Sequence, residues 1–230
     1  MQFYKSDLLQ YISGSISDTD LLEQLTELGL EVDQSKKEKN DLLIKLDLTP
    51  NRGDCFSLIG IARDVCAVNN LKLKLPKFKK QQQSLDSKKT ISVDKSACSS
   101  YLGQIIKLKS KGKTPQYIKK TLKAADIGQV NPIVDITNYV MLHTGQPLHA
   151  FDNKKIGKKI YVKFPSKRTR LKLLDGASHE ITKDYLTISD EKGVIALAGI
   201  MGCANSEVDE ATQEIFLESA CFEPASIRGN

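Results

Sequence analysis

A histidine, a glutamate and a pair of glycines are the residues of this sequence that could together form a chemical site. His149 follows a Gly-Gln-Pro turn and precedes Phe151, which places a polar ring among apolar neighbours. Near neutral pH such a ring can bind or release a proton, but a histidine in this setting is also commonly a hydrogen-bonded core residue. For the other two histidines, His143 and His179, we expect ordinary exposure to solvent.

Glu218 is the carboxylate with the most unusual surroundings, since its neighbours in sequence are largely apolar. Burying a carboxylate is costly unless it is paired or hydrogen-bonded, so this position indicates a functional role more than the surface glutamates do. Gly199 and Gly202 follow an apolar run that predicts a buried strand, where a missing side chain allows a ligand or another element to approach closely. The residues alone therefore predict a possible pocket formed by His149, Gly202 and Glu218.

Several familiar catalytic arrangements are missing from the sequence. It contains no G-x-S-x-G elbow, no H-E-x-x-H pair and no P-loop, which leaves the usual hydrolase and nucleotide-binding sites without support. The five cysteines are odd in number, widely spaced and without a C-x-x-C pair. We therefore expect reduced thiols, with neither a disulfide framework nor a metal site.

The composition sets broad limits on the class of protein. A chain of 230 residues with 40% apolar and 27% charged residues is typical of a soluble globular protein and is long enough for two domains. No apolar run approaches the roughly 20 residues that span a bilayer, and the N-terminus does not resemble a signal peptide, so we expect a cytoplasmic protein without membrane contact. The net charge of +6 permits a polyanionic partner such as RNA without requiring one.

The first part of the chain predicts a small α+β domain over residues 1–80. Leucine spacing and Ser/Asp caps predict its helices, alternation predicts its strands, and a charged stretch at 33–41 predicts an exposed loop. For Arg52, in the turn 49–54, we expect one of two roles: its guanidinium forms an ion pair inside the domain, or it binds a carboxylate or phosphate. The expected helices are 6–12, 17–28 and 55–68, and the expected strands are 30–32 and 42–48.

A lysine- and glutamine-rich stretch marks the predicted domain boundary, with a linker over 81–90, and residues 91–230 predict a larger α+β domain with a mixed sheet. Within it, residues 132–152 predict a buried helix that Thr137 or Asn138 caps, a stop at Gly145 and a turn that presents His149. A helix is expected at 114–125, and the expected strands are 91–93, 101–108, 159–163, 171–174, 180–181, 185–188, 194–198 and the run before Glu218.

Long strings of the sequence carry a resemblance to a known family. They are LDLTPNRGDCFSLIGIARDV, VDITNYVMLHTGQPLHAFD and LAGIMGCANSEVDEATQEIFLESACFEPASIR. In type, order and interval they resemble the bacterial phenylalanyl-tRNA synthetase beta subunit, and the resemblance covers nearly the whole chain. It implies the N-terminal portion of such a subunit, with an editing-type domain that hydrolyses tyrosine mischarged onto phenylalanine tRNA.

The resemblance also implies roles for individual residues and partners. His149 would lie near the ester, Gly202 would line the pocket with Asn138, and Glu218 would recognise the tyrosine hydroxyl, while a positioned water attacks. The aminoacylation site is expected on the alpha subunit, in a heterotetramer that binds phenylalanine tRNA. ATP and magnesium are expected for the whole enzyme, and no cofactor or metal for this portion.

The sequence departs from the family pattern in places. The usual oligonucleotide-binding-fold insertion for tRNA is replaced by the short stretch 33–41, Gly128 stands where the family often has arginine, and Cys203 stands where it has glycine. The pocket is therefore expected to have lost a cation and gained bulk, and the domain to be truncated at its C-terminal end. Two alternatives stay open: an editing-inactive structural module that supports the alpha subunit or tRNA, and an independent RNA-binding module using lysines of 72–89 and 107–123.

Overall fold

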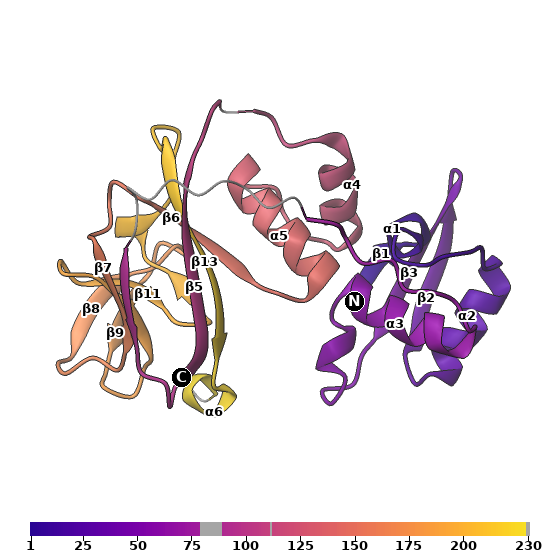
Figure 1. Cartoon of the computed structure of the whole chain (residues 1–230), viewed down its shortest axis with the longest axis horizontal. Coiled ribbons are helices and arrows are strands. Elements are labelled where there is room, and N and C mark those ends of the chain that lie inside the picture. Colours follow the sequence, from indigo (N-terminus) through magenta and orange to yellow (C-terminus); the bar gives the residue numbers. More distant parts are fainter. Residues whose placement is uncertain (79–88, 111, 229–230) are drawn as a thin grey trace. The chain divides into compact units, whose positions relative to one another are not determined.

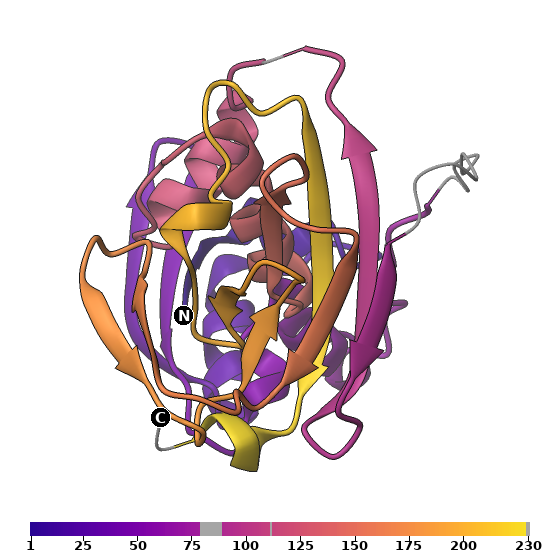
Figure 2. The same cartoon turned by 90° about the vertical axis from the view of Figure 1, so that its left-hand side faces the viewer.

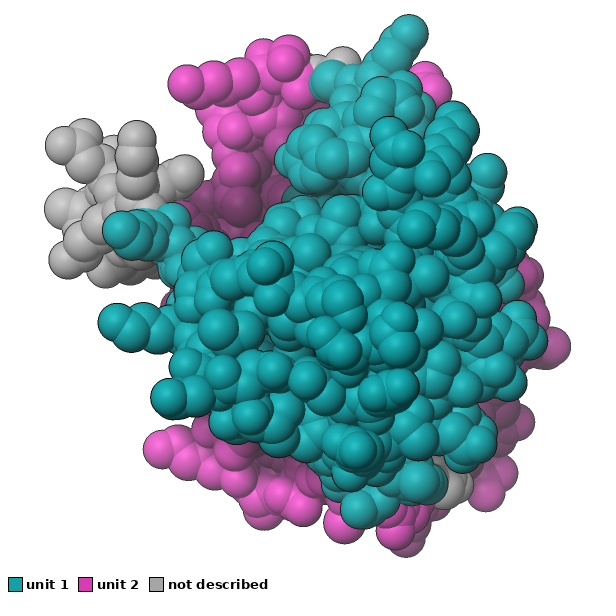
Figure 3. All heavy atoms as spheres, turned by 90° about the vertical axis from the view of Figure 1, so that its right-hand side faces the viewer, with its two compact units in different colours: residues 1–81, 112–147 teal, residues 82–111, 148–230 magenta. Residues whose placement is uncertain are grey.

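The computed structural model describes residues 1–78, 89–110 and 112–228 and divides the chain into two compact units. Unit 1 combines residues 1–81 with 112–147, and unit 2 combines 82–111 with 148–230 (Figure 3). The predicted domains, 1–80 and 91–230, stay a prediction, and the compact units differ from them in the placement of 112–147. Most of the predicted linker and part of the lysine-rich stretch 72–89 lie outside the described residues.

Unit 1 contains a three-stranded antiparallel sheet with the strand order β1-β3-β2 (Figure 1). Its core is a cluster of fully buried side chains that includes Leu8, Leu21, Ile44 and Ile61. These come from the helical and alternating patterns seen in the sequence. The elements are β1 (Gln2–Tyr4), α1 (Lys5–Leu9), α2 (Asp18–Glu27), β2 (Glu31–Glu38), β3 (Asp41–Asp47), a 3₁₀ turn (Gly53–Cys55), α3 (Leu58–Val68), α4 (Gln116–Ala124) and α5 (Pro132–Thr144).

The exposed loop predicted at 33–41 is wrong, because β2 continues to Glu38 and pairs with β3 along that stretch. The charged side chains of β2 are mostly exposed, so the strand shows no apolar alternation that sequence patterns could detect. Strands at sheet edges commonly carry such charges. A tight turn, in which Lys39 has a positive φ of 54°, joins β2 to β3, so the two strands form a hairpin.

Two predicted helix starts are also wrong. Helix α3 begins after Ser57, whose Oγ accepts a hydrogen bond from the N–H of Gly60 at 3.1 Å, because residues 53–55 form the 3₁₀ turn. Helix α5 begins earlier than predicted, after Asn131, whose side chain accepts from the N–H groups of the second and third helical residues. Thr137 and Asn138 therefore lie inside α5. The predicted stop at Gly145 is confirmed, with a left-handed φ of 77°.

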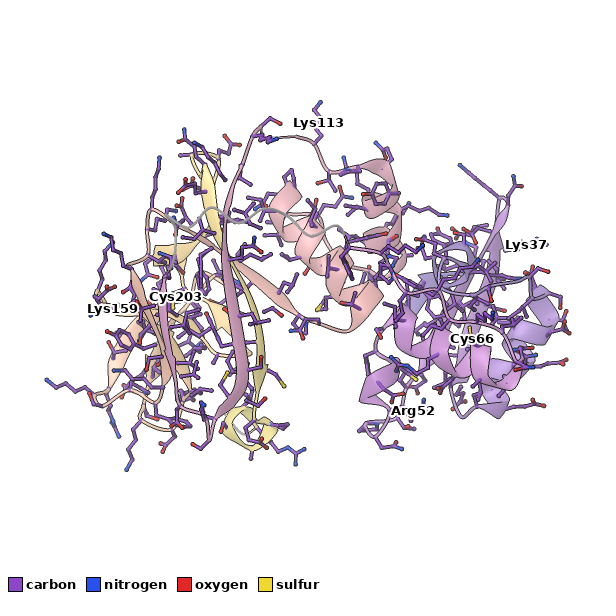
Figure 4. All side chains as sticks on the ribbon, in the orientation of Figure 1. Lys37, Arg52, Cys66, Lys113, Lys159 and Cys203 are labelled. Carbon is purple, nitrogen blue, oxygen red and sulfur yellow. The ribbon has the colours of Figure 1, made fainter. Side chains whose placement is uncertain are left out.

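Arg52 connects the turn 49–54 to the rest of unit 1, in agreement with the first of its two predicted roles, an ion pair inside the domain. Its guanidinium donates to both carboxylate oxygens of Asp54, at 3.1 and 3.0 Å, and also pairs with Asp64 and the carbonyl of Leu28. Figure 4 labels Arg52 beside this turn. With its donors used in this way, Arg52 acts as a structural ion-pair partner.

Helices α4 and α5 belong to unit 1 because buried polar contacts join them to its N-terminal residues. The Thr121 hydroxyl donates to Asp7 at 3.0 Å, and the Tyr11 hydroxyl lies 2.6 Å from Nδ1 of His143. His143 is only 2% exposed, so the expectation of solvent exposure is wrong for this residue. Its ring fills a buried site between aromatic neighbours, Tyr11 and Tyr139.

Unit 2 contains a five-stranded sheet with the order β12-β11-β10-β7-β4, a three-stranded sheet β5-β13-β6 and the hairpin β8-β9. Strands β4 and β7 are parallel and the other pairs are antiparallel, so the sheet is mixed and the predicted α+β class is confirmed. The strands are β4 (Thr90–Val93), β5 (Cys98–Lys107), β6 (Leu148–Asp152), β7 (Lys159–Lys163), β8 (Thr169–Lys172), β9 (Ser178–Ile181), β10 (Thr187–Ser189), β11 (Val194–Leu197), β12 (Met201–Gly202) and β13 (Glu214–Phe222), with a 3₁₀ turn at Ala204–Ser206 and α6 at Pro224–Ile227.

Strands β5 and β13 run side by side over most of their length, and β6 pairs with the other edge of β13 (Figure 2). The core of unit 2 includes the buried rings of Phe151 and Phe216 together with Ile160, Val162 and Ile188. His149 lies on β6, two residues before Phe151, and not on a turn as the sequence suggested. Among the described helices, none is long and apolar enough to cross a membrane.

Candidate functional site

His149 and Glu218 lie directly opposite each other on neighbouring strands. In the register of β6 and β13, His149 pairs with Glu218, and in the register of β13 and β5, Glu218 pairs with Gly103. Directly opposed residues share one face of a sheet, with their Cβ atoms about 5 Å apart. We call His149 and Glu218 the polar row. Phe151 and Phe216, each two residues further along the same strand, lie on the same face, so the polar row borders the core of unit 2.

Gly202 provides the space that the imidazole of His149 occupies. A Cβ atom at position 202 would lie 2.7 Å from both Cε1 and Nε2 of that ring, closer than van der Waals contact allows. The imidazole also packs edge-on against Phe151, with ring centroids 4.5 Å apart. The structure thus brings together His149, Gly202 and Glu218, three of the residues that the sequence singled out.

Burial makes both titratable groups of this row electrically neutral near pH 7. Glu218 is 5% exposed, and burial raises the pKa of its carboxyl to about 8, although the neighbouring Tyr101 hydroxyl offsets part of that rise. Burial lowers the pKa of His149 to about 4. A neutral carboxylic acid can donate as well as accept a hydrogen bond, and a neutral imidazole keeps a lone pair for a proton or a water molecule.

Two buried oxygens beside this row have no well-formed hydrogen bond within the described residues. They are Oε2 of Glu218 and the hydroxyl of Tyr101 on β5. Sequence reasoning missed Tyr101, although it recognised the strand that carries it. The spacing Tyr101-x-Gly103 was visible, but only the pairing of β5 with β13 shows that these residues face Glu218.

Two predicted pocket residues belong to the other compact unit. Asn138 is half-buried on α5 of unit 1, and Gly128 is exposed in the loop that precedes this helix. Asp135 holds that loop, since its carboxylate accepts from the N–H of Val130 at 3.0 Å and from the hydroxyl of Thr114. Their contribution to the pocket around His149 stays a prediction.

Cys203, which is labelled among the strands of unit 2 in Figure 4, belongs to a buried apolar cluster. The cluster contains Leu173, Ile181 and Leu197, and Cys203 is 2% exposed. Burial raises the pKa of this thiol to about 11, so it stays protonated and unreactive near neutral pH. The bulk that replaces the expected glycine is accommodated in that cluster.

One group of side chains in unit 1 has the spacing of a metal site. Ligand atoms of Asp54, Cys55 and Asp64 lie within 4.8 Å of one another. The guanidinium of Arg52 already pairs with both carboxylates and donates to the Cys55 sulfur. The positive charge of Arg52 therefore takes the place that a metal ion would fill, and these side chains form an ion-pair network.

Comparison with known proteins agrees with the resemblance seen in the sequence. A family described as "B3/4 domain" matches residues 97–230. A relative named phenylalanine–tRNA ligase beta subunit, from Rhodopirellula baltica, is 37% identical over 225 residues, covering 96% of this chain and 33% of the relative. One of the same name, from Photorhabdus laumondii, is 42% identical over 204 residues, covering 88% of this chain and 26% of the relative.

Among solved structures, an N-terminal fragment of the phenylalanyl-tRNA synthetase beta subunit from Pyrococcus horikoshii has the same fold. It matches with a TM-score of 0.51 and 20% identity, covering 99% of this chain and 69% of that one. The chain spans about a quarter to a third of the length of the curated relatives that it matches.

Proposed function

Because this chain belongs to the B3/4 domain family, we propose that it serves as a portion of a phenylalanine–tRNA ligase beta subunit and acts in phenylalanyl-tRNA synthesis. Support comes from relatives of that name, which match 83% to 96% of the chain at identities from 37% to 44%. The chemistry of aminoacylation, with ATP and magnesium, is assigned to the alpha subunit. No step proposed for this chain uses either.

We further propose that the B3/4 domain edits, by hydrolysing tyrosine esterified to phenylalanine tRNA. The observation that carries this is the carboxyl of Glu218, which is buried beside His149 with one oxygen unpaired. A site with a buried polar group binds a ligand hydroxyl and is left unsatisfied by a ligand that lacks it. Glu218 would thus favour a tyrosyl over a phenylalanyl group, as editing requires.

His149 supplies the second part of the proposed site. Its neutral imidazole is held in place by Gly202 and Phe151, so it can hydrogen-bond the ester or the water that attacks it. Water adds to the ester carbonyl, the bond to the tRNA ribose oxygen breaks, and free tyrosine and uncharged tRNA result. The protein contributes orientation of the reactants, and no residue forms a covalent bond to the substrate.

The partners follow from the same proposal. An alpha subunit in a heterotetramer and phenylalanine tRNA are the proposed partners, and a cytoplasmic location is proposed with them. The net charge of +6 agrees with a polyanionic partner, but solvated lysines on other proteins produce a similar charge.

Hydrolysis of tyrosyl-tRNA(Phe) by the chain assembled with its alpha subunit tests the editing proposal. We expect wild-type protein to hydrolyse this ester above background, and Glu218→Ala and His149→Ala each to lower the rate by at least tenfold. Glu180→Ala and His179→Ala are matched controls, since both side chains are exposed in unit 2, and we expect them to leave the rate unchanged. Absence of hydrolysis by the wild type would contradict the editing proposal and favour the alternative of an editing-inactive structural module that supports the alpha subunit or tRNA.

The RNA-binding alternative has its own test. An independent RNA-binding module requires that this chain alone bind tRNA with an affinity that falls steeply with salt, because each neutralised phosphate releases counterions. A flat titration at low salt would exclude it.

A further inference from the structure

Tyr101 and Glu218 are diagonal neighbours on one face of the three-stranded sheet of unit 2. Tyr101 pairs with Ala220, and Gly103, two residues further along β5, pairs with Glu218. Residues separated by two positions along a strand point to the same side, so the tyrosine ring and the carboxyl share the face that borders the core.

The two side chains are buried and incompletely satisfied. Tyr101 is 9% exposed and Glu218 is 5% exposed, and neither the tyrosine hydroxyl nor Oε2 of the glutamate makes a well-formed hydrogen bond within the described residues. They nonetheless lie close to each other: burial is the main cause that raises the pKa of Tyr101, and the charge of the Glu218 carboxylate and a side-chain interaction with it raise that pKa further. Buried polar groups without partners are uncommon in native proteins, and two beside each other indicate a missing third group.

The surroundings favour a small neutral polar group in that position. Phe216 covers Gly103 so closely that a Cβ atom there would lie 2.1 Å from its ring, which gives the polar pair an apolar border. His149, opposite Glu218, is held neutral by burial. An anionic ligand atom would have no counter-ion among these groups, whereas a hydroxyl would bury no charge.

We propose that the Tyr101 hydroxyl and the Glu218 carboxyl together bind a single phenolic hydroxyl, which makes Tyr101 a second specificity-determining residue of the site. This inference rests on the editing function proposed above and assigns its hydroxyl recognition to two residues. The phenol hydroxyl of the ligand donates a hydrogen bond to a carboxyl oxygen of Glu218 and accepts one from the hydroxyl of Tyr101. A phenylalanyl group would leave both protein groups unpaired.

Binding of amide-linked tyrosyl and phenylalanyl derivatives of 3′-amino-3′-deoxyadenosine, which cannot be hydrolysed as esters, tests the proposal. We expect the wild-type chain to prefer the tyrosyl compound, and Tyr101→Phe to lower the ratio of the two affinities by roughly 3- to 10-fold, as expected for loss of one hydrogen bond. Tyr185→Phe, in the same unit, is the control and should leave the ratio unchanged. An unchanged ratio in Tyr101→Phe would overturn the proposal.

Thermal unfolding of the same variants supplies an independent readout. If the Tyr101 hydroxyl is unpaired in the free protein, Tyr101→Phe removes an unsatisfied group, and its melting temperature should equal or exceed that of the wild type. A clear fall in melting temperature would mean that the hydroxyl is already bonded to Glu218, and would also overturn the proposal. Preferential tyrosyl binding without hydrolysis of tyrosyl-tRNA(Phe) would refute editing while leaving the role of Tyr101 intact.

Discussion

The imidazole of His149 lies so close to Gly202 that position 202 has no room for a methyl group, since a Cβ atom there would lie 2.7 Å from the ring. Gly202→Ala should therefore displace the ring or strain β12, at a cost of about 1–3 kcal/mol, as for other overpacked sites. We expect lower stability in denaturant titration and slower hydrolysis of tyrosyl-tRNA(Phe). Gly53→Ala is the matched control, because a Cβ atom there meets no atom within 4 Å. Equal effects from the two substitutions would contradict the close contact.

Glu218 should make unit 2 less stable as the solution becomes more alkaline. The folded state keeps the proton until about pH 8, whereas the unfolded chain releases it near pH 4.5. The stabilisation from burying the neutral acid is thus fully present below pH 4.5 and is lost as the pH rises to 8, with a limiting slope of about 1.4 kcal/mol per pH unit. Glu218→Gln should flatten this dependence in denaturant titrations between pH 5 and 9, and a parallel curve would contradict the assignment.

The contact between Tyr11 and His143 should contribute to the stability of unit 1. Tyr11→Phe leaves the buried imidazole without its partner at Nδ1, which we expect to cost about 1–3 kcal/mol. Tyr117→Phe alters a residue that is 61% exposed and should change stability by less than about 0.5 kcal/mol. Urea unfolding of the two variants makes the comparison, and similar midpoints would show that the buried hydrogen bond contributes little.

Low pH should weaken the same contact. Burial lowers the pKa of His143 from an ordinary value of 6.5 to about 4, so the stability that comes from holding it neutral is present above pH 6.5 and is lost as the pH falls towards 4. His143→Gln should remove this part of the acid dependence. The measurement is the urea midpoint of wild type and variant at pH 7 and pH 4.5, and an equal fall in both would contradict the prediction.

Restoring glycine at position 203 should harm the fold without improving the site. The thiol of Cys203 fills part of an apolar cluster, so Cys203→Gly creates a cavity and frees the backbone of the unfolded chain, at a cost of about 1–3 kcal/mol. Hydrolysis of tyrosyl-tRNA(Phe), measured where both proteins are folded, should not increase. A faster reaction in the variant would show that the thiol does obstruct the pocket.

Sequence patterns predicted the elements whose signals are local. The glycine at 145 had to adopt a left-handed turn, and the alternation of 42–48 matches β3 because one face of that strand packs on the core. The prediction of a loop at 33–41 was wrong because the signal of this strand is not local. A charged edge strand has no alternation of apolar and polar residues, and only its pairing with β3 identifies it. The cap of α5 was misplaced because Asn131 and Pro132, which start the helix, precede an apolar run that also suits a strand.

The candidate site was predictable to the extent that single residues were unusual in their neighbourhoods. An apolar setting indicated Glu218, and paired glycines indicated Gly202, but the roles came from resemblance. Tyr101 could not be found in this way, because its relation to Glu218 depends on pairing between strands far apart in sequence. The burial of His143 escaped for the same reason, as Tyr11 lies 132 residues away.

The division of each compact unit into two chain segments has a consequence for how the protein is made. Asp7 and Tyr11 leave the ribosome long before Thr121 and His143, the residues that bond them in the folded state. These two contacts can form only after synthesis has reached α4 and α5, whereas the apolar core cluster of unit 1 comes from residues 3–66. Contacts of such long range slow folding, so the early segment can form its apolar core first and gain its partner for Tyr11 only after a further 132 residues have been made.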